Sequence, residues 1–302
     1  MPKLHVHLFL SVSLLLVLLK TQTVAAVPSE CQDVWRIDSR PVARLRADEQ
    51  NVSKLQYYRW NNNRWQISDE ETFFDTQQAD VPVILFALGF TLTTREMTQT
   101  GFSIVRNFDP NKPCRIVFWD WYSDRTGDAY RIDIRKRLPI ADNTGDYLAL
   151  FLQKLKPQSK TCLFGFSLGN RILCGAAETL RKSEQRPEGL RLHLVLSGAA
   201  ADWDKFAKGG QHGNVPQVAE KIMVTYSPSD FVLRFYPAVY GLRFRPAALG
   251  LKGLPMQNID PIYRAQFENI DVTHYNGGKH QTLTHVQNSA FRSRINTYFF
   301  FE

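Results

Sequence analysis

The segment Gly165-Phe166-Ser167-Leu168-Gly169 places a serine between two glycines at the spacing Gly-x-Ser-x-Gly. An apolar run at 161–166 precedes this serine, and a helix-like run at 168–180 follows it. Such a strand–turn–helix setting distinguishes a nucleophile elbow from a chance match of the pattern. We therefore expect Ser167 to stand on a sharp turn and to attack a carbonyl carbon.

The neighbours of this serine are expected to support the same chemistry. Gly165 and Gly169 should lie where the helix packs back against the strand and a Cβ atom would collide. The amide of Leu168, at the start of the helix, can stabilise a developing oxyanion. A second donor should come from the loop after the first parallel strand, where Leu88-Gly89-Phe90-Thr91 points to the amide of Phe90.

A serine hydroxyl needs an adjacent base, and behind an elbow of this kind the chain order is serine, acid, histidine. His280 lies in the glycine-containing loop 276–280, just before the last helix-like run, and is the favoured base. His285 lies about one helical turn further on and is the alternative base.

The acid should follow the end of a strand and orient the imidazole ring. Asp230 comes shortly after the apolar run 222–226 and is the favoured acid. Asp202 follows the run 192–196 and is the alternative. Each aspartate could instead cap a helix, which is a routine position for this residue type.

The rest of the chain predicts the scaffold that positions these groups. Residues 56–60 and 64–67, around Asn61-Asn62-Asn63, are typical of an antiparallel hairpin. Buried strands alternating with helices indicate an α/β protein with a mostly parallel, twisted sheet and helices on both faces. The expected strands lie at 81–88, 114–119, 161–166, 192–196, 222–226 and near 267–272, and the expected helices include 146–155, 168–180 and a terminal helix at 282–299.

Residues 231–263 are the least regular part of the predicted scaffold. They contain several prolines, and between Asp230 and Asp260 every ionised residue is basic. We expect an irregular, cap-like excursion over the edge of the sheet. Its basic residues are Arg234, Arg243, Arg245 and Lys252.

The chain has 302 residues, 44% of them hydrophobic and 22% charged, which fits a globular protein with a sizeable core. Residues 1–26 have the outline of a secretory signal peptide: a basic start, an apolar run and small residues at Val24-Ala25-Ala26. We expect a secreted or periplasmic protein, anchored in a membrane if the signal is not cleaved, with 27–302 as one domain.

The net charge limits the expected binding partners, and the cysteines limit the expected metal sites and disulfides. The charge of +8 is spread along the chain, which predicts weak contact with anionic membrane surfaces at most and no nucleic-acid binding. The four cysteines match no zinc-binding spacing and are too few for a disulfide scaffold. A bridge between Cys31 and Cys114 is an open alternative.

From about Val34 to its C-terminus the chain resembles the α/β-hydrolases, and more narrowly the uncharacterised exported α/β-hydrolase-like proteins of bacteria. The shared features are the elbow, Phe90 after the loop glycine, Ser229-Asp230, and the late Gly278-Lys279-His280. The resemblance implies a Ser167–Asp230–His280 triad, esterase-like acyl transfer, and no metal or organic cofactor. Leu88 departs from the family, in which many members have a histidine before the loop glycine.

These patterns predict a secreted serine hydrolase that cleaves carboxylic esters, of small molecules or of lipids, through an acyl-enzyme. Two alternatives stay open. Leu88 and the basic excursion favour a non-catalytic relative that uses the fold for binding or surface attachment. A lipase acting at lipid interfaces would share the triad and differ in its substrate.

Overall fold

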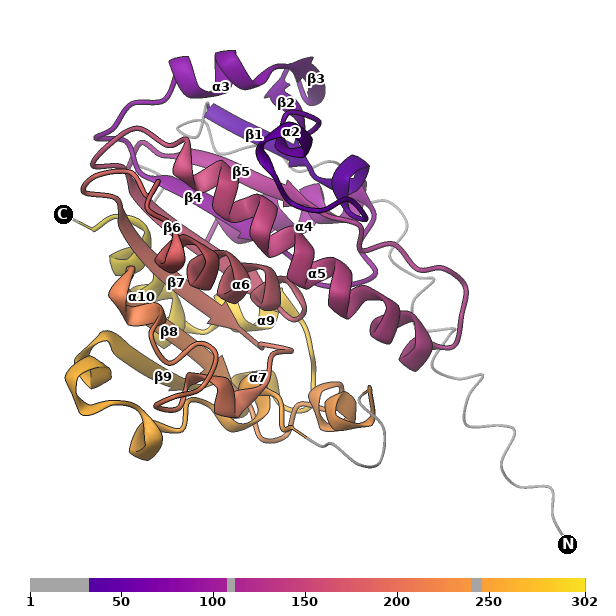
Figure 1. Cartoon of the computed structure of the whole chain (residues 1–302). Helices are drawn as coiled ribbons and strands as arrows, with labels where there is room; N and C mark the ends of the chain where they lie inside the picture. The colour runs from indigo at the N-terminus through magenta and orange to yellow at the C-terminus, as the bar shows by residue number, and fades with distance from the viewer. Residues whose placement is uncertain (1–32, 108–111, 240–245, 302) are drawn as a thin grey trace, which may run out of the picture.

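The computed structural model describes residues 33–107, 112–239 and 246–301. These residues form one sheet of nine strands in the order β3-β2-β1-β5-β4-β6-β7-β8-β9 (Figure 1). The β3-β2-β1 pairings are antiparallel and all the others are parallel. The strands are β1 (Asp33–Asp38), β2 (Gln56–Asn61), β3 (Arg64–Ser68), β4 (Val83–Ala87), β5 (Arg115–Asp120), β6 (Lys160–Phe166), β7 (Arg191–Ser197), β8 (Ala219–Tyr226) and β9 (Phe267–Asp271).

Helices cover both faces of the sheet (Figure 1). Alternate strand residues enter two separate cores, so Leu85 of β4 packs on the side of α5 (Tyr130–Gln153) and α6 (Gly169–Lys182). Its neighbour Phe86 packs on the side of α4 (Thr94–Val105), α9 (Thr282–Gln287) and α10 (Ser289–Phe299). A sheet buried on both faces explains why its strands are nearly continuous apolar runs.

Short helices occupy the connections between the larger elements. The α-helical ones are α2 (Glu49–Val52), α3 (Glu70–Asp75), α7 (Leu249–Lys252) and α8 (Thr273–Asn276). The 3₁₀ helices are η1 (Arg40–Val42), η2 (Trp203–Phe206), η3 (Val215–Gln217), η4 (Leu233–Val239), η5 (Met256–Asn258) and η6 (Pro261–Gln266). In the described part of the chain, no helix combines the length and the apolar character needed to cross a bilayer.

The expected α/β fold, hairpin and parallel strands are confirmed, and two helix expectations are corrected. The terminal helix expected at 282–299 is wrong, because Asn288 ends α9 in an extended conformation and starts α10. The Oδ1 atom of Asn288 accepts the amides of Ala290 and Phe291 at 2.9 and 3.2 Å, as an N-cap residue does. The helix expected at 146–155 begins at residue 130 and continues through Pro139.

Several expectations fall partly or wholly on residues outside the described ranges. The signal peptide expected at 1–26 and Cys31 lie there, so the Cys31–Cys114 bridge stays a prediction. In the excursion expected at 231–263, the described residues form only short helices, and Arg243 and Arg245 are outside.

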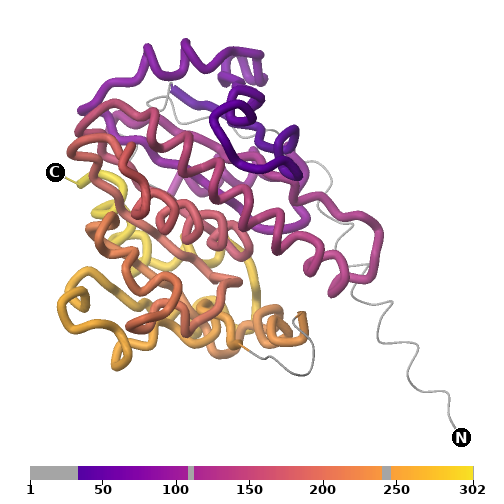
Figure 2. The backbone as a smooth tube through the Cα atoms, in the orientation of Figure 1, coloured from indigo at the N-terminus to yellow at the C-terminus, as the bar shows by residue number. Residues whose placement is uncertain are grey.

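The end of the chain lies against the middle of the sheet. Figure 2 shows the C-terminal segment, in yellow, running behind the strands. The rings of Phe164 in β6 and Phe299 in α10 are 6.4 Å apart, centroid to centroid. This return brings the late histidines near the carboxyl ends of the central strands, where ligands bind in α/β sheets.

Candidate active site

Ser167 joins β6 to α6 in a strained backbone conformation. Its φ angle is +54°, in the left-handed region that non-glycine residues rarely occupy. The turn is closed by two hydrogen bonds to the next strand connection: the Ser167 amide donates to the Ser197 carbonyl at 3.2 Å, and the Ala200 amide donates to the Ser167 carbonyl at 3.1 Å. The sharp turn expected at Ser167 is therefore present.

Close packing explains the glycines on either side of Ser167. A Cβ atom on Gly169 would lie 1.9 Å from the carbonyl oxygen of Ala87 in β4. One on Gly165 would lie 2.3 Å from the Oδ1 atom of Asn170. On the opposite side, a Cβ atom on Gly89 would lie 3.0 Å from the Cβ of Ser167, so the 88–92 loop passes directly over the serine.

Asn170 is a supporting residue that the sequence reasoning missed. It is fully buried, and its Nδ2 atom donates to the carbonyls of Ser167 and Ser197 at 3.1 and 2.9 Å. One side chain thus ties the elbow to the end of β7. Its position directly after the second elbow glycine was visible in the sequence, but the contact with Ser197 depends on strand order.

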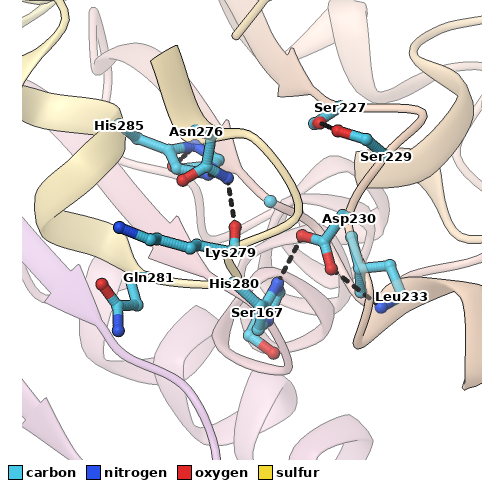
Figure 3. Close-up of polar contacts among 12 residues, drawn as sticks. Ser167, Ser227, Ser229, Asp230, Leu233, Asn276, Lys279, His280, Gln281 and His285 are labelled. Carbon is cyan, nitrogen blue, oxygen red and sulfur yellow. Dashed lines mark hydrogen bonds and ion pairs between the residues drawn. The ribbon is translucent and has the colours of Figure 1, made fainter. Parts of the chain in front are cut away.

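His280 and the buried Asp230 form a hydrogen-bonded pair (Figure 3). The Nδ1 atom of His280 donates to the Oδ2 atom of Asp230 at 2.7 Å, and the side chain of Asp230 is 1% exposed. The other carboxylate oxygen, Oδ1, accepts the Leu233 amide at 2.9 Å. Because Asp230 holds Nδ1–H, the Nε2 atom of a neutral His280 carries a lone pair and can accept a proton.

The imidazole of His280 packs on the residue directly before the serine. Its ring lies 4.8 Å from the ring of Phe166, centroid to centroid. The Nε2 atom is buried and has no hydrogen-bond partner among the described residues, so no bond joins it to the Ser167 hydroxyl in this state. Hydrogen bonds between a serine and its base are often long in ligand-free structures and tighten when substrate binds.

The two alternative residues lie in other surroundings. Asp202 accepts a hydrogen bond from the Tyr236 hydroxyl at 2.8 Å and pairs with Lys205 at 3.0 Å. Burial works to raise the pKa of Asp202, but these two partners outweigh it and hold the pKa below its ordinary value. His285 is buried, and both its ring nitrogens are engaged by Ser197, Thr225 and Asn276. The geometry therefore favours Asp230 and His280 over these alternatives.

The loop that contains Phe90 is fixed by residues after β5. The Nε1 atom of Trp121 donates to the Leu88 carbonyl at 2.8 Å, and the Thr91 amide donates to the Ser123 carbonyl at 3.1 Å. Thr91 has a φ angle of +76°, a second strained conformation beside the serine. These contacts hold the loop although Leu88 has no polar side chain.

The two expected oxyanion donors are free to bind a ligand. Within the described residues, the amides of Phe90 and Leu168 donate no hydrogen bond. Leu168 occupies the N-cap position of α6, where the helix dipole adds partial positive charge. Backbone amides in this setting can stabilise negative charge on an oxygen near Ser167.

A small apolar cavity opens beside Ser167. Its volume is about 50 Å³, which suits a small group rather than a long chain. One wall comes from the start of α5 and another from η4, within the excursion expected to act as a cap. Arg131 and Ser167 contribute polar groups to the lining, and its apolar and aromatic residues are Phe90, Tyr130, Ile134, Leu168, Ala200, Val232, Leu233, Phe235, Tyr236 and Val239.

A larger cavity, of about 400 Å³, lies beyond Arg171 and does not include Ser167. It is lined mainly by charged side chains that pair with one another, such as Arg171 with Asp142 and Lys205 with Asp202. No serine is among its lining residues, so this cavity is not a candidate site for a serine nucleophile.

In the described residues, no cluster of three or more histidine, cysteine or acidic side chains could hold a metal ion. No protein-family model matches the sequence, and no curated protein matches it.

Proposed function

We propose that the protein is a serine hydrolase of the α/β-hydrolase type that cleaves carboxylic esters. The observation that carries the proposal is the combination of a strained Ser167 elbow with a buried His280–Asp230 pair at the same sheet edge. A structural serine would need neither the strain nor an adjacent imidazole whose outer nitrogen is left unpaired.

In this mechanism His280 is the general base. Its Nε2 atom takes the proton of the Ser167 hydroxyl as the serine oxygen attacks the ester carbonyl carbon. Asp230 keeps the proton on Nδ1 and stabilises the imidazolium that forms. The protonated His280 then gives its proton to the leaving alcohol, and an acyl group remains on Ser167.

The second half of the reaction releases the acyl group. His280, neutral again, removes a proton from a water molecule that attacks the acyl carbonyl, and the carboxylic acid leaves as Ser167 regains its proton. In both halves the amides of Leu168 and Phe90 stabilise the oxyanion. Removal of one such donor typically costs about 10²- to 10³-fold in kcat.

The cavity beside Ser167 supports a short acyl group. Its walls are mainly apolar, with Arg131 as a charged lining residue, and its volume of about 50 Å³ is far below the roughly 300 Å³ or more of sites for drug-sized ligands. We therefore expect acetyl and butyryl esters to be better substrates than long-chain esters in dilute solution.

The test is hydrolysis of p-nitrophenyl butyrate by the folded protein and by the Ser167→Ala variant. We expect turnover by the wild type and a loss of about 10⁴-fold or more in the variant. The Ser293→Ala variant is the control, since Ser293 is exposed in α10 and its hydroxyl donates to the Ala290 carbonyl of the same helix, outside the site. A wild type without turnover, or equal activity in S167A, would contradict the proposal.

A second candidate substrate class is favoured by the mouth of the cavity. Phe235 and Tyr130 line the cavity and are 57% and 47% exposed, and Phe231, whose ring lies 5.2 Å from that of Phe235, is 64% exposed. Exposed aromatic side chains concentrated at a site mouth indicate contact with an apolar partner. This observation supports esters presented in micelles or at a lipid surface.

Activity measured across the critical micelle concentration of one ester separates the two substrate classes. An interface-acting enzyme gives a sharp rise in rate above that concentration, and Phe231→Ser, outside the cavity lining, reduces the rise. An enzyme for dissolved esters follows ordinary saturation, and the same substitution leaves its rate on p-nitrophenyl acetate nearly unchanged.

A further inference from the structure

His285 lies in a fully hydrogen-bonded network below the candidate active site. Its Nδ1 atom lies 2.9 Å from the Thr225 hydroxyl and 3.0 Å from the Ser197 hydroxyl, at the ends of β8 and β7. Its Nε2 atom lies 2.9 Å from the Nδ2 atom of Asn276. The side chain is 1% exposed, and its ring edge packs against Phe166 at 5.8 Å.

Asn276 connects this histidine to the loop that contains His280 (Figure 3). Its Nδ2 atom donates both to the Nε2 atom of His285 and to the carbonyl of Lys279. Its Oδ1 atom accepts a hydrogen bond from Thr284. The Lys279 carbonyl belongs to the peptide that directly precedes His280, so this contact fixes the orientation of that peptide.

The polarity of the network follows from its partners. A carbonyl only accepts, so the Asn276 amide nitrogen must face Lys279, and the same NH₂ group donates to His285. Nε2 of His285 is therefore the acceptor, and Nδ1 carries the proton toward Thr225 and Ser197. Burial, aided by the charge of His280 and opposed by Asp230, lowers the pKa of His285 to about 4, so the ring is neutral at neutral pH.

The opposite side of the loop is tied to the acid. The Phe231 amide donates to the Gly278 carbonyl at 3.0 Å, and the Ser229 hydroxyl donates to the Gly277 carbonyl at 2.6 Å. The loop 277–280 is thus held between the Asp230 segment and Asn276. Without Asn276 and His285, only the Asp230 side would orient the imidazole of His280.

We propose that His285 acts through Asn276 as a positioning residue, holding the His280 loop so that the His280 imidazole faces Ser167. The inference rests on the proposed ester hydrolysis, and it assigns His285 no contact with substrate. His285 transmits the positions of β7 and β8 to the base, while Asp230 controls its tautomer.

Two substitutions at position 285 separate positioning from general stability. A glutamine amide ends near the position of Nε2 and keeps an acceptor for Asn276, whereas an asparagine amide ends near Nδ1 and does not. We expect His285→Asn to lower kcat on p-nitrophenyl butyrate about 10-fold or more, because misplacement of a reacting group is costly. KM should change less than about twofold, and His285→Gln should keep kcat within about threefold of wild type.

A second pair of variants tests Asn276 with a matched control. Asn276→Asp keeps the shape of the side chain but places a carboxylate oxygen against the Lys279 carbonyl, and kcat should fall as in H285N. Asn288→Asp makes the same change at another buried asparagine, where the Oδ1 cap of α10 is retained. We expect N288D to keep the wild-type kcat.

NMR spectroscopy reports the orientation of the His280 imidazole without any substrate. In the ¹⁵N-histidine-labelled protein, the Nδ1 proton of His280 bound to Asp230 should give a strongly downfield signal in the wild type, H285Q and N288D. That signal should shift or broaden in H285N and N276D. Equal signals and equal kcat in all five proteins, or matching losses in H285Q and H285N, would overturn the proposal. If the NMR signals of the five proteins differ as expected but the wild type hydrolyses no ester, the proposed function is refuted and the positioning role of His285 is not.

Discussion

The elbow at Ser167 and the loop at His280 lie at the same edge of the sheet but are built in different ways. At the elbow, the essential residues are neighbours in sequence: two glycines, the serine and Asn170 within 165–170. Asn276 and His285 flank the loop in sequence, but the loop also depends on distant residues: Asp230 holds His280, and Ser197 and Thr225 hold His285.

This difference separates two ways of positioning a candidate catalytic side chain. Ser167 is presented by local backbone strain and by the absence of side chains at Gly165 and Gly169. His280 is oriented by long-range hydrogen bonds between buried side chains, which lose strength together when one member is removed. Substitutions at the elbow should therefore affect folding and chemistry together, whereas substitutions around the loop should mainly affect chemistry.

The largest expected effect comes from the acid at the loop. Asp230→Asn removes the carboxylate that keeps the proton on Nδ1 of His280, and kcat should fall about 10³- to 10⁴-fold. Asp202→Asn is the matched change at the alternative acid, whose partners are Tyr236 and Lys205, and kcat should stay within about threefold. Steady-state kinetics with p-nitrophenyl butyrate measures both, and a larger loss in D202N would reverse the assignment of the acid.

A smaller effect, on stability, is expected at the elbow. Gly169→Ala puts a Cβ atom within 1.9 Å of the Ala87 carbonyl, and relief of that clash should lower the free energy of unfolding by about 3 kcal/mol. Gly175→Ala, in the same helix, meets atoms only at 3.7 Å and should stabilise by about 0.5–1 kcal/mol. Urea unfolding compares the two variants. Equal stability in both would mean that the elbow is not packed as described.

The smallest effect is the pH dependence that His285 contributes around the loop. Its pKa is lowered to about 4, mainly by burial and also by His280. Between about pH 6.5 and pH 4, the unfolded chain, in which histidine has an ordinary pKa near 6.5, therefore binds a proton that the folded chain does not. The free energy of unfolding is unaffected by this histidine above about pH 6.5. It decreases as the pH falls toward 4, by about 2 kcal/mol between pH 7 and pH 5.

Urea unfolding at pH 7 and pH 5 measures this dependence in the wild type and in H285Q. Burial also lowers the pKa values of His193 and His212 to about 4, so the variant should keep their share of the loss. The difference between the two proteins reports His285 alone. An identical change in stability in both proteins would show that His285 does not titrate as its burial requires.

Local patterns predicted much of this molecule. The apolar runs located the parallel strands β4 to β8 but not β1, and Gly-x-Ser-x-Gly after such a run located the strained Ser167. Chain order and loop position were enough to single out Asp230 and His280, which the structure joins by a hydrogen bond.

The remainder depends on contacts that no local pattern contains. The helix break at Asn288 was missed because asparagine is tolerated inside a periodic run, and only the cap geometry reveals its role. Asn170 and Trp121 became visible as supporting residues only when strand order brought their partners near, and the role of Asn276 only when the loop geometry placed its amide against Lys279 and His285. The network around His285 joins β7, β8 and α9, and the spacing of these residues carries no signal of their proximity.

Covalent labelling tests most directly whether Ser167 is activated by His280. A fluorophosphonate probe, followed by peptide mapping, should modify Ser167 alone in the folded wild type. The rate should fall about 10³-fold or more in His280→Ala, and labelling should vanish in S167A or after unfolding. A wild type that stays unlabelled, or that labels Ser167 equally fast without His280, would contradict the account.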